Sequence, residues 1–133
     1  MTLNDESQIA WVLMAVVFGG GEKQASIESI ISAADYVNHA IIKYDELFGG
    51  IHFLLQKEII YRSGSNYKLS KRVLNRYKSI KGNNAAKYWK VTEEIIIESK
   101  DQQDIHIQPL EEIVKKNAYQ EAVNNYIERN KVK

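Results

Sequence analysis

The 133-residue sequence contains no cysteine, which excludes disulfides, thiolate zinc sites and a cysteine nucleophile and fits a reducing compartment. Histidine is scarce. His39, His52 and His106 lie far apart, and none has the spacing of a metal-binding motif such as His-Glu-x-x-His. Gly19-Gly20-Gly21 follows a helical pattern and is not followed by Gly-Lys-Ser/Thr, so it does not indicate a phosphate loop. We therefore expect no catalytic residues, no metal, no cofactor and no enzymatic activity.

Long apolar runs are also missing. The longest, Ile9 to Phe18, is about half of the roughly 20 residues that a membrane helix needs. The N-terminus lacks the basic region of a signal peptide. The apolar fraction of 44% and the charged fraction of 26% are ordinary for one soluble globular domain. These features predict a cytoplasmic protein without a membrane partner.

The net charge of +1 conceals a strong asymmetry along the chain. Residues 1–56 hold two Lys against seven Asp or Glu, a net charge of −5. Residues 57–90 hold ten Lys or Arg against one Glu, a net charge of +9, and residues 91–133 carry −3. Such sorting indicates a polyanionic partner or an electrostatically paired dimer. A solvated basic face that is balanced by acidic neighbours within the fold explains it equally well.

The first predicted helix, residues 5–18, is apolar on nearly every side. One face carries Ile9, Val12, Leu13, Val16 and Val17, and the other carries Trp11, Met14 and Phe18. A helix of this kind must be covered on both faces. We expect the second face to be covered by the C-terminal helix or by another subunit.

Two further helices are predicted over residues 26–38, with Ser26 as the cap, and over residues 44–57. Gly49 and Gly50 lie inside the second of these, where each costs about 1 kcal/mol relative to alanine. Their presence indicates a close approach of helix 26–38 or of a partner backbone.

A hairpin follows, with strands at 59–62 and 67–69 joined by the turn residues Ser63-Gly64-Ser65-Asn66. Ser70 is expected to cap a fourth helix, and Asn83 or Asn84 a fifth that ends near Glu98. The remaining expected features are a short strand at 105–107, the only proline, Pro109, in the first turn of a last helix, and a break near Asn117.

The passage Glu46-Leu47 … Leu54-Leu55-Gln-Lys-Glu-Ile-Ile-Tyr-Arg … Tyr67-Lys-Leu-Ser70 resembles the helix-to-wing segment of winged helix-turn-helix domains. With the two preceding helices, the resemblance covers about 65 residues. It implies a mainly α fold with a small β-hairpin: a winged helix-turn-helix core at 1–82 and a C-terminal helical extension at 83–133. The extension would pack on the first helix or on a second subunit.

Three features, at four positions, depart from the family pattern. Glu58 stands where a glycine usually ends the third helix, and Lys43 stands where a Ser, Thr or Asp cap would be better. Asp45 and Glu46 occupy the first turn of that helix, where a recognition helix usually meets DNA. Their carboxylates would repel phosphates, so they weaken the case for base recognition by this helix.

The resemblance implies a small DNA-binding or regulatory protein, with double-stranded DNA as its partner. The wing and the following helix would contact the nucleic-acid backbone, because phosphates are bound by cations and hydrogen-bond donors. The third helix would supply any groove contact. The expected nucleic-acid-binding residues are Tyr44, His52, Gln56, Lys57, Arg62, Ser65, Asn66, Lys68, Lys71, Arg72 and Arg76.

The alternative is a winged-helix protein-interaction or dimerisation module that binds no nucleic acid. The two-sided first helix and the acidic outer segments favour a homodimer, since two-fold dimers are the commonest oligomers. The fifth and last helices are the expected dimer parts.

Overall fold

The computed structural model describes residues 6–82, 84–102, 104–105 and 115–131. It is mainly helical, with one two-stranded antiparallel hairpin, which confirms the coarse class expected from the sequence. The elements are α1 (Glu6–Gly20), α2 (Ile27–Asn38), α3 (Tyr44–Gln56), β1 (Ile60–Ser63), β2 (Asn66–Leu69), α4 (Lys71–Lys78), α5 (Ala85–Ser99) and α7 (Lys116–Lys131). The short strand expected at 105–107 and the position of Pro109 lie outside the described residues.

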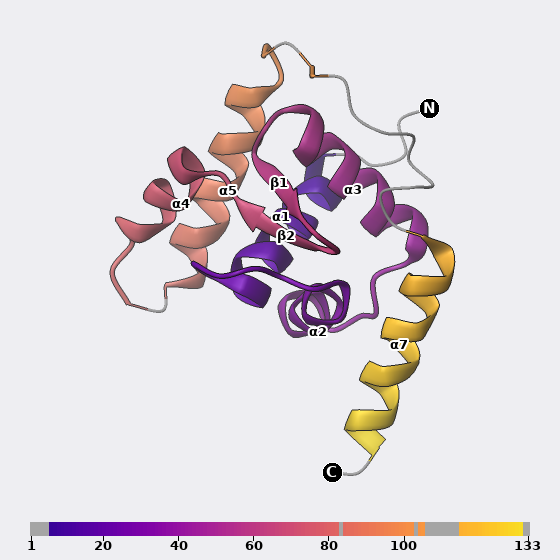
Figure 1. The fold of residues 1–133 in the computed structure, drawn as a ribbon. Helices are drawn as coiled ribbons and strands as arrows, with labels where there is room; N and C mark the ends of the chain where they lie inside the picture. Colours follow the sequence, from indigo (N-terminus) through magenta and orange to yellow (C-terminus); the bar gives the residue numbers. More distant parts are fainter. Residues whose placement is uncertain (1–5, 83, 103, 106–114, 132–133) are drawn as a thin grey trace.

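Helix α1 forms the centre of the molecule (Figure 1). Every residue from Ile9 to Val17 is buried, because α2, α3 and α5 all pack against this helix. Its second face meets α5, where the rings of Phe18 and Tyr88 lie with their centroids 5.2 Å apart. The nearly all-round apolar pattern is thus satisfied by helices of the same chain. The expectation that the last helix covers the second face was wrong, because α5 lies there and the last helix packs on α2. None of the described helices has the length and apolar content needed to cross a membrane.

The contact between α1 and α3 is close because Gly50 has no side chain. A Cβ atom at this position would lie 2.5 Å from Cγ2 of Val12, well inside contact distance. The expected close approach therefore exists, but at Gly50 the neighbour is α1. The expectation that helix 26–38 approaches there was wrong, because α3 crosses the central helix at this glycine.

Local capping explains where α2 and α3 begin and end. The Ser26 hydroxyl accepts from the backbone N–H of Ser29, and the Ser29 hydroxyl accepts from the N–H of Ser26. Lys43 gives α3 no such cap, and the Glu46 carboxylate instead accepts from the Lys43 N–H at 3.0 Å. At the other end of α3, Glu58 adopts the left-handed conformation with φ of 56°. A glutamate thus occupies the conformation that a glycine would adopt more readily.

The hairpin is held against the helices. Its register pairs Ile60 with Leu69 and Arg62 with Tyr67, and Gly64 turns the chain with φ of 64°. Ala25, in the loop between α1 and α2, forms an isolated antiparallel bridge with Tyr67. Tyr67 is only 1% exposed, and this burial raises its pKa to about 12. Tyr67 is therefore a packing residue of the hairpin.

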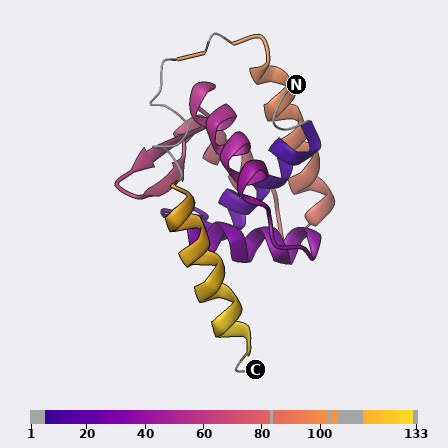
Figure 2. The same cartoon turned by 90° about the vertical axis from the view of Figure 1, so that its right-hand side faces the viewer.

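Helices α5 and α7 lie on opposite sides of the body (Figures 1 and 2). Helix α4 packs on α5, and a buried 2.7 Å hydrogen bond joins Tyr77 to Thr92 between them. Helix α7 packs on α2, and its C-terminal end projects beyond the rest of the chain (Figure 2). It begins at Lys116, so Asn117, near which a break was expected, lies in its first turn.

Candidate nucleic-acid interface

The first turn of α3, where a recognition helix would meet DNA, lies against α7. The Tyr44 ring packs on Phe48 at 5.1 Å and on Tyr119 of α7 at 5.5 Å between ring centroids. The Tyr119 hydroxyl also donates a 2.6 Å hydrogen bond to the carbonyl of Ile42, just before α3. Tyr44 is therefore part of a contact within the chain, and Asp45 beside it is exposed and acidic.

The other end of α3 lies against the segment that follows α5, here called the connector, which contacts α3 through Gln102, Asp104 and Ile105. Lys57 Nζ lies 2.6 Å from Asp104 Oδ1 and donates to the Gln102 carbonyl at 2.6 Å, and its side chain is only 10% exposed. The Gln56 carbonyl accepts from the Ile105 N–H at 3.0 Å. Partial burial lowers the pKa of His52, against the opposing charge of Asp104. A positively charged groove contact at His52 is therefore disfavoured.

The two arginines of α4 are held by neighbouring elements of the chain. Arg72 donates to the carbonyl of Lys57 at 3.2 Å, so it binds the C-terminal end of α3. Arg76 binds two carboxylates of α5, those of Glu98 at 2.9 Å and Glu94 at 3.1 Å. The hydrogen bond to Glu98 is the main cause of the raised pKa of Arg76. Helical spacing predicted both arginines on one face of α4. In the structure Arg72 contacts the end of α3, whereas Arg76 contacts α5.

The remaining expected residues lie on the hairpin and at the start of α4. Arg62, Ser65 and Lys71 are exposed, whereas Asn66 and Lys68 are half-buried. Lys68 Nζ lies 5.9 Å from the ring centroid of Tyr61, its partner across the hairpin. Because side chains alternate along a strand, Arg62 and Lys68 project from opposite faces of the ribbon. The Asn66 amide donates to Gln24 Oε1 at 3.1 Å.

The structure therefore brings together two subsets of the expected site residues. Lys57 and Arg72 meet at the end of α3, and Arg62, Ser65, Asn66, Lys68 and Lys71 share the hairpin region. Tyr44 and Arg76 belong to other contacts. Sequence reasoning missed the role of Tyr119 and Asp104, since their positions depend on how the chain returns to α3. Among the described residues, no group of three or more His, Cys, Asp or Glu side chains could hold a metal ion.

Comparison with models of known protein families, with curated proteins and with solved structures finds no match to this chain. The function is therefore argued from the geometry of its own residues.

Proposed function

We propose that the chain is a regulatory winged helix-turn-helix module that acts through self-association and does not recognise DNA with α3. The order α1, α2, α3 and hairpin supports the winged-helix part of this proposal. The Ala25–Tyr67 bridge supports it further, because it fixes the hairpin beside the three helices.

The observation that carries the proposal is the covering of α3 at both of its ends. Tyr119 packs on Tyr44 at the start, and Asp104 binds Lys57 just beyond the last turn. A recognition helix must enter a groove about 12 Å wide with its side chains directed to the bases. Such entry would require α7 and the connector to move away from α3.

An exposed aromatic patch supports self-association. Tyr36 on α2 is 77% exposed and Phe18 at the end of α1 is 42% exposed. Both line a concave surface together with Ala33 and Arg129. Aromatic residues and arginine are enriched at protein interfaces, so this concave surface is a suitable contact for a second copy of the chain.

Light scattering over a range of protein concentrations tests self-association. We expect a dimer at micromolar concentrations. The Tyr36→Asp variant should shift the midpoint of the monomer–dimer transition to at least tenfold higher protein concentration. Tyr61→Asp is the matched control, since Tyr61 is also exposed, at 46%, but lies on the hairpin. A monomer at high micromolar concentration, or equal effects of the two variants, would contradict the proposal.

A second candidate function is contact with the nucleic-acid backbone through the exposed cations Arg62 and Lys71. The exposure of Arg62 and Lys71 favours it, since phosphate contacts need accessible cations. Fluorescence anisotropy with a labelled mixed-sequence duplex at low salt tests it. The Arg62→Glu/Lys71→Glu variant should lose binding, whereas Lys23→Glu/Lys87→Glu, with the same charge change, should retain it. Equal loss in both variants, or no binding by the unmodified protein, would exclude this function.

A further inference from the structure

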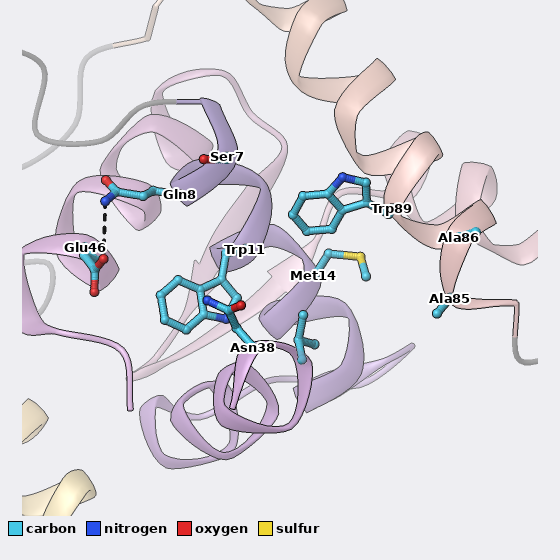
Figure 3. A pocket seen from close by; sticks show the side chains of 10 residues that line it. Ser7, Gln8, Trp11, Met14, Asn38, Glu46, Ala85, Ala86 and Trp89 are labelled. Carbon is cyan, nitrogen blue, oxygen red and sulfur yellow. Dashed lines mark hydrogen bonds between the residues drawn. The ribbon is translucent and has the colours of Figure 1, made fainter. Parts of the chain in front are cut away.

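A groove of about 810 Å³ opens between α1, the C-terminal end of α2 and the start of α5 (Figure 3). Both tryptophans of the chain line it, Trp11 from α1 and Trp89 from α5. Met14 and Val37 add further apolar surface. Its size and lining are those of a small-molecule site, since such sites span about 300–1,000 Å³ and are mostly apolar with a few polar groups.

The charged group among the described lining residues lies at one end of the groove. In the view of Figure 3, Gln8 and Glu46 lie to the left, Ala85 and Ala86 lie to the far right, and Trp11 and Met14 lie between them. The Gln8 amide donates to the Glu46 carboxylate at 3.3 Å. Among the lining residues that the structure describes, Glu46 is the only one with an ionisable side chain. The described part of the groove therefore has a largely apolar body, with Ser7 and Asn38 as further polar groups, and one negative charge at one end.

Several of these side chains are held in place by contacts within the protein. Trp11 Nε1 donates a buried 2.9 Å hydrogen bond to the Ala34 carbonyl, which fixes the indole against α2. Glu46 is oriented by the Lys43 N–H at the start of α3. A site whose walls are already ordered loses less conformational entropy when a ligand binds.

We infer that this groove binds a compact apolar molecule that carries an ammonium group. The apolar body would lie against the indoles and Met14, where burial of apolar surface is favourable. The ammonium group would be directed toward Glu46, because charge-assisted hydrogen bonds to a carboxylate are the stronger kind. The indole faces attract cations as well. An anion of the same shape would be repelled by Glu46.

Tryptophan fluorescence gives a direct readout, because the only two tryptophans both line the groove. The probes are 1-adamantylmethylammonium and 1-adamantanecarboxylate, which are similar in shape, opposite in charge and transparent at the excitation wavelength. We expect the ammonium probe to change the emission saturably, and the carboxylate to need at least tenfold higher concentration. Since this groove is lined by neither Tyr36 nor Phe18, the result does not depend on whether the chain self-associates.

Glu46→Gln removes the charge but keeps a side chain that can cap α3, since glutamine also serves in capping boxes. It should abolish most of the preference for the ammonium probe. Glu93→Gln on α5, the control with the same charge change, should retain the preference. Ala86→Phe, at an exposed position that lines the groove, should weaken the response to both probes without unfolding the protein. No emission change with either probe, equal affinities for the two, or an unchanged preference in Glu46→Gln would overturn the inference.

Discussion

Helices α1 and α7 have nearly the same length, 15 and 16 residues, but they are held by different forces. Nine consecutive residues of α1 are buried, and three other helices pack around them. In α7, the buried hydrophobic residues are Ala122 and Val123. Its other contacts lie at the edge of the core: the Tyr119 ring packs on Tyr44, and polar contacts join Tyr119 to the Ile42 carbonyl, Tyr126 to Asp35 and Arg129 to Glu28.

The difference separates a helix that determines the fold from a helix that is attached to it. Burial of apolar surface contributes about 25 cal/mol per Å², and it is lost in full only when α1 leaves the core. A hydrogen bond contributes only about 1 kcal/mol net, and an exposed ion pair contributes less. We therefore expect α7 to open without unfolding of the core, as peripheral elements of proteins often do.

The largest expected effect comes from shortening one buried side chain in each helix. Leu13→Ala should lower the free energy of unfolding by about 2–5 kcal/mol, because Leu13 is fully buried and leaves a cavity. Val123→Ala at the edge of α7 should cost about 1 kcal/mol. Urea denaturation followed by circular dichroism measures both. Equal losses would show that α7 is as much a part of the core as α1.

The second prediction concerns the crossing of α1 and α3. Gly50→Ala should destabilise the protein by about 1–3 kcal/mol through overpacking against Val12, although alanine favours helix by about 1 kcal/mol. Because the clash is with one side chain, Val12→Ala should relieve it. In a double-mutant cycle measured by thermal unfolding, the pair should therefore cost less than the sum of the two single variants. Strict additivity would contradict this packing.

The expected elements that were correct depend on local chemistry. Ser26 and the spacing of the isoleucines that follow it predicted α2, and Gly64 predicted the turn of the hairpin. Caps, periodicity and turns are encoded within a few residues. The departure at Glu58 was also visible in the sequence. The structure shows how α3 ends without a glycine, because the backbone of Glu58 itself adopts the left-handed conformation.

The candidate site was less predictable, because the partners of its cations are distant in sequence. Lys57 binds Asp104, and Arg76 binds Glu94 and Glu98 on a later helix. Helical spacing shows which face carries a charge, but it does not show which element will cover that face. The basic segment 57–90 and the acidic flanks are thus partly matched inside one chain, as the alternative explanation of the charge asymmetry expected.

A third prediction tests whether α7 can detach alone. Tyr126→Phe removes the hydroxyl that binds Asp35, a contact that is also the main cause of the raised pKa of Tyr126, about 12. The loss should be about 1 kcal/mol and confined to α7. Hydrogen exchange should accelerate in α7 while exchange in α1 stays unchanged. Tyr61→Phe on the hairpin is the control, and acceleration throughout the molecule would show that α7 does not open separately.

The smallest effect concerns the connector at the end of α3. The pKa of His52 lies below its ordinary value of 6.5, mainly because of burial, so folding favours the neutral ring. The unfolded chain then binds the proton more readily. The contribution of His52 to stability is present above about pH 6.5 and is lost as the pH falls through the lower pKa of the folded state.

Between pH 7.5 and 5.5, the melting temperature should therefore fall more in the unmodified protein than in His52→Gln, which cannot bind the proton. His39→Asn, which removes an exposed histidine at the end of α2, should keep the full decrease. An identical decrease in His52→Gln would mean that the connector leaves His52 as accessible to water as it is in the unfolded chain.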